Sequence, residues 1–174
     1  MKYQEKSPEV FAADEEIVKV ARADIEFLKE CAPASANRRT RFCAHQTGGD
    51  SIHEMLIVLL RGTYIRPHKH VAKVESFHVI EGVVDVVIFN ETGTIAEVVR
   101  MGDYASGRNF YYRIAHPAYH TLILRSEVVV IHETTNGPFR REETIFAPWS
   151  PVETDAGAAE EFMKKLSDSV SASV

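Results

Sequence analysis

Cysteine is scarce in this chain of 174 residues, which carries only Cys31 and Cys43. Two cysteines are too few for a disulfide framework, so both are expected to be reduced thiols. Cys43 sits in a stretch where apolar and polar residues alternate. We therefore interpret it as a small packing residue rather than as a nucleophile.

Long apolar runs and an excess of basic residues are also missing. No apolar run approaches the ~20 residues of a membrane-spanning helix. Residues 1–16 lack the apolar core of a secretory signal, so we predict a cytoplasmic protein with no membrane partner. The 20 basic residues are outnumbered by 25 acidic ones, giving a net charge of −5. Nucleic-acid binding usually needs a basic surface, so no nucleic-acid partner is predicted.

Short apolar or alternating runs follow one another from residue 41 onward. Turn residues such as Gly, Asn, Asp and Pro separate these runs, and no helical period lies between them. Many short strands at regular spacing are typical of an antiparallel sandwich or barrel. The predicted strands cover residues 41–45, 54–60, 63–66, 75–81, 83–89, 94–100, 109–115, 119–124 and 126–133.

The N-terminal part of the chain has a different pattern. Residues 1–15 are polar without a strong period and are predicted to be a loose arm, and residues 16–20 are a candidate short strand. Residues 24–32 carry apolar groups at the spacing of one helix face, and Pro33 is expected to end this helix.

The C-terminal part also contains a predicted helix. Residues 146–151 include two prolines and cannot be helical, so Phe146 and Trp149 are expected to pack over the barrel. After the polar residues at 154–155, apolar residues recur every three or four positions, which favours an amphipathic helix. A frayed tail over residues 167–174 is the alternative.

The stretch from Gly62 to Gly82 contains the densest set of chemically informative residues. His68 and His70 are two positions apart, so in a strand they share a face with Cα atoms roughly 6–7 Å apart. Two imidazoles at that separation can reach one metal ion, and Glu75 can add an oxygen ligand if the chain turns back. Two exposed strand histidines would show the same spacing, but glycines at both ends suit the tight turns such a site needs.

This spacing, Gly62-x5-His68-x-His70-x4-Glu75-x6-Gly82, resembles the first motif of the cupin superfamily, with every signature position filled. Over roughly residues 17–153 the chain is similar to the WbuC-type cupin-fold metalloproteins. The segments that carry this closer resemblance are residues 41–45, 55–57, 67–75, 120–122, 137–139 and 146–151.

The resemblance implies an all-β fold, the double-stranded β-helix or cupin jelly-roll barrel, with a short helix near each end. No repeat or low-complexity linker divides the chain, so residues 1–174 are predicted to form a single cupin domain. Its core is expected at about residues 36–150, preceded by an arm and helix at 1–35 and followed by a helix or tail at 151–174. Related barrels often pair, so a homodimer is an expected oligomeric state.

The resemblance also implies a further ligand from a second cupin motif, for which His120 is the best candidate. The surrounding residues match that motif poorly, and His116 is the competitor. His120 begins an alternating strand in which Leu122 and Leu124 share its face, as expected for a barrel interior. His116 precedes Pro117, which biases it toward an extended or turn conformation.

Three imidazoles and one carboxylate suit one divalent transition metal, and Fe, Mn, Ni, Zn and Cu all remain open. The predicted ligands are His68, His70, Glu75 and His120. Such a set leaves coordination positions open for a small molecule. The alternative is a metal that only stabilises the barrel structurally, or a vestigial site that no longer functions.

Three side chains are candidate catalytic residues: Lys73, Tyr64 and Arg41. Lys73 lies between two metal-ligand candidates, where it can bind an anion or relay a proton, or remain a solvated lysine. Tyr64, Tyr112 and Tyr119 can line the pocket or simply pack.

Three arginines, Arg38, Arg39 and Arg41, lie close together in the sequence. They form either a solvated turn or an anion clamp for a carboxylate or phosphate.

The remaining histidines have weaker assignments. Alternation points His78 away from Glu75 and toward the surface or an interface. A pocket role is open for His45, whereas His53 and His132 are interpreted as structural or solvated.

Three functions stay open at this point. The first is a metal-dependent enzyme, such as an isomerase, epimerase or lyase, acting on a small sugar-like or anionic metabolite. The second is a metal-dependent dioxygenase, and the third is a non-catalytic ligand-binding or sensor protein. The WbuC resemblance implies a link to surface-polysaccharide (O-antigen) biosynthesis but implies no particular reaction.

Overall fold

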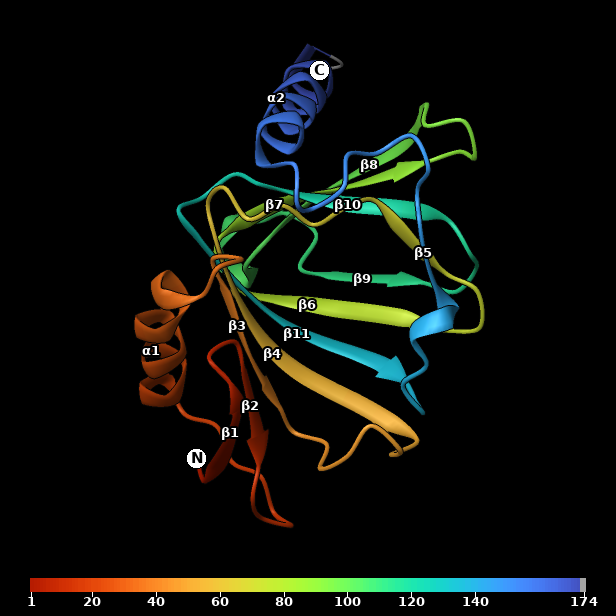
Figure 1. The fold of residues 1–174 in the computed structure, drawn as a ribbon. Helices are drawn as coiled ribbons and strands as arrows, with labels where there is room; N and C mark the ends of the chain where they lie inside the picture. Colours follow the sequence, from red (N-terminus) through yellow and green to blue (C-terminus); the bar gives the residue numbers. More distant parts are fainter. Residues whose placement is uncertain (173–174) are drawn as a thin grey trace.

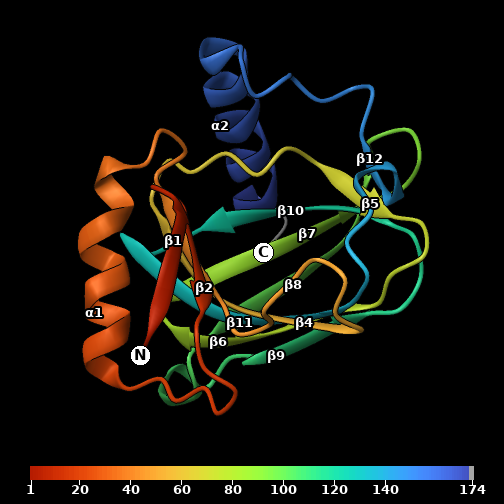
Figure 2. The same ribbon diagram turned by 60° about the horizontal axis from the view of Figure 1, so that its bottom comes forward.

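The computed structural model describes residues 1–172, which form two β-sheets packed face to face with one helix on the outer face of each (Figures 1 and 2). Within these residues every strand pair is antiparallel except β2 with β3. The seven-stranded sheet has the order β1 (Tyr3–Ser7), β2 (Val10–Ala13), β3 (Arg39–Cys43), β4 (Ile52–Leu60), β11 (Val128–Asn136), β6 (Glu75–Glu81) and β9 (Tyr111–Ile114). The five-stranded sheet has the order β12 (Thr144–Phe146), β5 (His68–His70), β10 (Tyr119–Leu124), β7 (Val83–Phe89) and β8 (Ile95–Gly102).

The inner faces of the two sheets enclose the main apolar core. Side chains alternate between the two faces of a strand, so every second residue of the long strands points inward. On β6 these are Phe77 and Val79, and on β10 they are Leu122 and Leu124, all of them buried in one cluster. The main apolar core therefore lies between the two sheets.

Helix α1 (Arg22–Cys31) covers the outer face of the seven-stranded sheet. Leu28 is fully buried there against Phe42 of β3 and Val58 of β4. Thr40, also on β3, donates its hydroxyl to the carbonyl oxygen of Leu28 at 2.8 Å. Because Thr40 and Phe42 face the helix, the alternate residues of β3 must face the barrel interior.

Helix α2 (Ala156–Ala172) covers the outer face of the five-stranded sheet. The carboxylate of Asp155 accepts a hydrogen bond from the backbone N–H of Ala158 at 3.0 Å, which caps the start of the helix. Leu166 and Val170 are buried against Phe89 and other outward residues of this sheet. None of the helices among residues 1–172 is long and apolar enough to cross a membrane.

The predicted all-β jelly-roll fold with a helix near each end is confirmed. Helix α1 begins two residues before the predicted start, and Pro33 follows it in a short 3-10 turn, η1 (Ala32–Ala34). Most predicted strands are present with ends shifted by a few residues. The final two residues of the predicted C-terminal segment lie outside the described part of the chain.

Three local predictions are wrong. Residues 1–15 are not a loose arm, because β1 and β2 pair and β2 joins the edge of the seven-stranded sheet. The rings of Tyr3, Phe11 and Phe27 pack together there. This is a contact between residues distant in sequence, so no periodic pattern within residues 1–15 signals it. Residues 16–20 and 63–66 are not strands.

The turn at Gly82, between β6 and β7, is tightly constrained. Gly82 has φ of 90°, and a Cβ added to it would overlap the carbonyl oxygen of Val128. Gly107 also has a positive φ, of 70°, but nothing lies within 4 Å of an added Cβ. An alanine at either position would adopt a strained backbone conformation, but only an alanine at position 82 would also overlap a neighbouring atom.

We predict that Gly82→Ala destabilises the fold much more than Gly107→Ala. Strain at positive φ costs about 1–2 kcal/mol in both variants. Overlap with Val128 adds roughly 1–3 kcal/mol in Gly82→Ala alone. Urea unfolding of the two variants and the unmodified protein measures the difference, and equal destabilisation would contradict this account of the turn.

Candidate metal centre

Four side chains from three strands converge at one end of the barrel interior. His68 and His70 come from β5, His120 from β10, and Glu75 begins β6. Their ligand atoms all lie within 4.8 Å of one another. His68 and His120 are direct partners in the β5–β10 pairing, whereas Glu75 approaches from the opposite sheet. The predicted ligand set is thus brought together by both sheets, and it could hold a metal ion.

Glu75 makes the closest contacts within this cluster. Its Oε2 lies 3.2 Å from Nε2 of His70, and its Oε1 lies 3.5 Å from Nε2 of His120. The ring of His68 completes the group, with its centroid 4.6 Å from that of His120 and 5.0 Å from that of His70. Glu75 and His120 are only 7% and 4% exposed, so the cluster is largely shielded from water.

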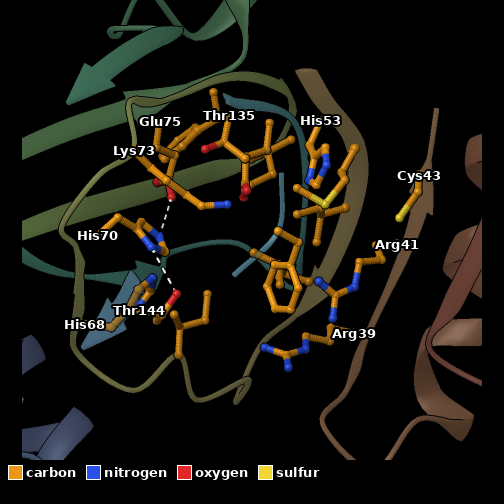
Figure 3. A pocket seen from close by; sticks show the side chains of 18 of the residues that line it. Arg39, Arg41, Cys43, His53, His68, His70, Lys73, Glu75, Thr135 and Thr144 are labelled. Carbon is orange, nitrogen blue, oxygen red and sulfur yellow. Dashed lines mark hydrogen bonds and ion pairs between the residues drawn. The ribbon is translucent and has the colours of Figure 1, made fainter. Parts of the chain in front are cut away.

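The second ring nitrogen of each histidine is already occupied. Nδ1 of His68 lies 2.9 Å from the carbonyl oxygen of Arg66, and Nδ1 of His120 lies 3.0 Å from that of Ala118. Nδ1 of His70 lies 3.1 Å from the hydroxyl of Thr144, its partner in the β5–β12 pairing (Figure 3). A carbonyl oxygen can only accept, so His68 and His120 donate through Nδ1, and their Nε2 atoms are left for a metal.

The protonation states of the cluster follow from burial and from these contacts. Burial opposes ionisation of Glu75, but hydrogen bonds from His120 and His70 outweigh it and hold the pKa of this carboxyl below its usual range. Burial and the neighbouring His120 lower the pKa of His68 to about 4. Burial alone would lower the pKa of His120, but its hydrogen bond with Glu75 raises it. At neutral pH the cluster therefore offers an ionised carboxylate and at least one neutral imidazole as ligands.

The cluster opens into a cavity of about 480 Å³ inside the barrel. This volume lies within the range of about 300–1,000 Å³ that is usual for small-molecule sites. Figure 3 shows His68, His70 and Glu75 on one side of the cavity and Arg39 and Arg41 on the opposite side. The wall between these two ends is mostly apolar and includes Met55, Ile57, Leu59, Ile65, Phe77, Leu122 and Ile131.

A second carboxyl group, that of Glu133, also lines the cavity. It lies on β11, two residues after Ile131 on the same inward face. Burial, and then the negative charge of Glu75, raise the pKa of Glu133 to about 8. The Glu133 carboxyl is therefore largely protonated at neutral pH, unlike that of Glu75.

The catalytic candidates separate into two groups. Lys73 lines the cavity with 9% of its surface exposed, and Arg41 lines it from β3. Tyr64 is not in this cavity: its hydroxyl donates to the carbonyl oxygen of Pro151 at 2.9 Å, and its ring packs against Phe162 of α2. It lies in the irregular segment at 63–66 that was predicted to be a strand, and it packs rather than lining the cavity.

The three arginines also separate. Arg39 and Arg41 line the cavity, whereas Arg38 is exposed and donates through Nε to the carbonyl oxygen of Arg61 at 3.1 Å. Arg38 has φ of 54°, at the turn that leads into β3. The anion clamp considered from the sequence is therefore reduced to two members.

Two histidines form part of the cavity wall on the side away from the metal cluster. The rings of His45 and His53 stack with their centroids 4.1 Å apart and an angle of 6° between their planes. Of the two alternatives for His53, structural or solvated, the solvated one is wrong, since His53 is 4% exposed; it also lines the cavity, which the sequence reasoning did not foresee. His53 shares the inward face of β4 with Met55, and that alternation was a usable signal, as it was for Glu133.

Except for Cys43, the other candidates lie away from the cavity. His116 and His78 are exposed, and His132 lies 3.8 Å from the carboxylate of Glu54. Tyr112 is buried beside Phe77 in the core, and Tyr119 packs on Trp149 toward α2. Cys43 lines the cavity wall, and burial raises the pKa of its thiol, which agrees with a packing role.

Comparisons with known proteins give only a general likeness. A family profile described as "Domain of unknown function (DUF6016)" matches residues 20–101, just under half of the chain. No curated protein is significantly similar in sequence.

Solved structures resemble the chain at low identity. The cupin domain of Cnp3 from Schizosaccharomyces pombe is 14% identical with a TM-score of 0.44, over 57% of this chain and 64% of that one. The capsular polysaccharide assembling protein CapF from Staphylococcus aureus is 17% identical with a TM-score of 0.48, over 62% and 31%. Oxalate decarboxylase from Lactobacillus farciminis is 16% identical with a TM-score of 0.44, over 56% and 27%. The chain covers less than two thirds of each of these three structures, and we infer function from the site itself.

The raised pKa of Glu133 predicts a pH-dependent cost to stability. The folded protein keeps this proton up to about pH 8, whereas the ordinary pKa is 4.5, so stability falls as pH rises between these values. In the metal-free protein, Glu133→Gln should have nearly the same free energy of unfolding as the unmodified protein at pH near 4.5. Above pH 8 it should be more stable by roughly 3–5 kcal/mol, since a difference of one in pKa corresponds to about 1.4 kcal/mol. Urea unfolding across this pH range measures the difference, and a constant difference would contradict the assignment.

Proposed function

We propose that this chain is a metal-binding cupin in which His68, His70, Glu75 and His120 hold one divalent transition metal. The observation that carries the proposal is the convergence of four ligand atoms within 4.8 Å, with the other ring nitrogen of each histidine already engaged. Histidine ligands in metal sites are usually oriented in this way by a second hydrogen bond. The donor set contains no thiolate, which favours a site that meets small molecules over a closed structural site.

The ligand set and the cavity together suggest what the site does. When bound, a divalent metal with open positions polarises a carbonyl or hydroxyl oxygen of a ligand in the cavity. Glu133 holds a proton at neutral pH beside the Glu75 cluster, and Lys73 places an ammonium group on the same wall. Groups that hold and move protons beside a metal suit isomerisation, epimerisation or elimination. We propose a reaction of this class on a small sugar-like or anionic metabolite.

The proposal also covers the biological role, the cellular compartment and the oligomeric state. The residues shared with WbuC-type proteins support a role linked to surface-polysaccharide (O-antigen) biosynthesis in the cytoplasm. The same resemblance supports a homodimer. Under this proposal the protein's partner is a small molecule, with neither nucleic acid nor membrane involved.

Elemental analysis of protein purified without a metal-affinity tag tests the site. We expect about one metal ion per chain in the unmodified protein, and well under a tenth of that in the double variant His68→Ala, His120→Ala. His78→Ala is the matched control, because His78 lies on β6 with Glu75 but is exposed on the outer face. It should keep the full metal content. Equal, sub-stoichiometric metal in all three proteins would refute the assignment.

Oxygen consumption separates the proposed reaction class from a dioxygenase. The proposal predicts no substrate-dependent oxygen uptake by the metal-loaded protein, measured with an oxygen electrode while sugar-like and anionic metabolites are added. Iron as the native metal together with such uptake would favour the dioxygenase instead. Ligand binding without turnover would favour the non-catalytic sensor.

A further inference from the structure

The cavity has two chemically different ends. At one end lies the cluster of three histidines and Glu75, and at the other lie Arg39 and Arg41 of β3 (Figure 3). Both ends line the same cavity of about 480 Å³, so one small molecule can contact both. The metal proposal uses only the first end and leaves the arginine end without a role.

Packing on the other face of β3 explains why the arginines point inward. Thr40 and Phe42 are both 0% exposed, because they face α1 on the outside of the sheet. Arg39 and Arg41 alternate with them and therefore lie on the inner face, next to the cavity. Turning them outward would expose Phe42 and break the hydrogen bond from Thr40 to Leu28. The inward direction of both guanidinium groups is thus enforced by the fold.

The positive groups of the cavity have few partners within the protein. Among residues 1–172, the guanidinium group of Arg41 has no hydrogen bond and no ion pair within 4.0 Å, and only the backbone N–H of Arg41 donates, to the carbonyl oxygen of Glu9 at 2.8 Å. Arg39 has one distant ion pair, with its Nε 3.7 Å from the carboxylate of Glu9, and this Nε has no hydrogen-bond partner in the described chain. Within residues 1–172 the side chain of Lys73 has no hydrogen bond and no ion pair within 4.0 Å, and its Nζ lies 5.5 Å from the centre of the Phe139 ring. All three retain donors for a ligand.

The charges around the cavity leave an excess of positive charge. Three cationic side chains line it, and they face two carboxyl groups, Glu75 and Glu133. Glu75 belongs to the metal cluster, and Glu133 is largely protonated at neutral pH because burial raises its pKa. A divalent metal in the cluster would add to this excess. Cationic groups in a shielded cavity are stabilised when an anion enters, and guanidinium groups bind carboxylate and phosphate oxygens in pairs.

We propose that Arg39 and Arg41 form an oxyanion subsite that orients the ligand of this cavity, with its carboxylate or phosphate at β3 and its oxygen donors toward the histidine cluster. The apolar wall between the two ends would contact the body of the molecule. Arg38 and Tyr64 have no part in this site. The ligand's orientation rests on the proposed metal function, whereas the oxyanion subsite itself does not, so the two can be tested separately.

The test is a titration of isotope-labelled protein with orthophosphate and, separately, with acetate, followed by NMR at neutral pH and constant ionic strength. Both probes are small enough to enter without fitting the whole cavity. We expect saturable shifts of the backbone amides of Arg39 and Arg41 and their neighbours on β3. Tighter binding of orthophosphate would identify a phosphorylated ligand class, and tighter binding of acetate a carboxylic acid. Absence of saturable shifts on β3 with both probes would overturn the proposal.

Variants separate the subsite from general charge effects and from the metal. Arg39→Gln, Arg41→Gln should weaken binding of the preferred probe by at least about tenfold. Arg113→Gln removes one positive charge from the exposed outer side of β9 and should change it by less than about twofold. Equal affinities in these two proteins would overturn the proposal, provided that the amide spectra show both folded.

The His68→Ala, His120→Ala variant makes failure of the two proposals distinguishable. It should still show saturable shifts on β3, because the arginine end does not need the metal. The zinc-loaded unmodified protein should bind the same probe more tightly than this variant, since the metal adds positive charge to the cavity. If the β3 shifts disappear in His68→Ala, His120→Ala, the anion binds at the histidine cluster instead, and the proposed arginine subsite is overturned. Failure of the protein to take up any of Fe, Mn, Ni, Zn or Cu would overturn the metal proposal alone.

Discussion

The contact between Glu75 and the imidazoles of His70 and His120 is the interaction on which the site depends. It joins residues from two different sheets, with Glu75 on the seven-stranded sheet and the histidines on the five-stranded sheet. A buried carboxylate is costly unless donors satisfy it, and here two Nε2 atoms do so. The same atoms would be the ligands of a metal. Stability of the metal-free barrel and affinity for a metal therefore depend on one small group of atoms.

Strand alternation connects the packing of the fold to the chemistry of the cavity. The outward residues of β3 and β4 are used by α1, and those of β7 and β10 by α2. Inward residues of β4, β7 and β10 fill the core, and inward residues of β3, β4 and β10 line the cavity. A helix on the outside of a sheet thus determines which side chains face the ligand space on the inside. Arg39 and Arg41 point inward because their neighbours Thr40 and Phe42 pack against α1, although the two arginines make no part of that packing.

Sequence reasoning succeeded where the signal was local. His68 and His70 share a face because they are two residues apart on a strand, and Gly62 and Gly82 both adopt the positive φ expected of turn glycines. It failed where the direction of a side chain depended on distant partners. Tyr64 lies on an irregular segment held by α2 and the C-terminal loop. His53 and Glu133 carried an alternation signal, but periodicity alone does not say which face of a strand is inward.

The N-terminal hairpin shows the same limit for the fold. Residues 1–15 have no strong period, yet β1 and β2 form because Phe11 packs against α1 and β2 pairs with β3. The sequence by itself indicated the β-rich fold class and the four side chains that converge. Three of these, His68, His70 and Glu75, follow from the spacing of one motif, whereas His120 came from strand alternation and a resemblance to a second motif that its neighbours match poorly. Only the tertiary structure decided what faces that cluster across the cavity. The register between strands distant in sequence, such as β3 with β4 and β11 with β6, decides which inward side chains oppose one another.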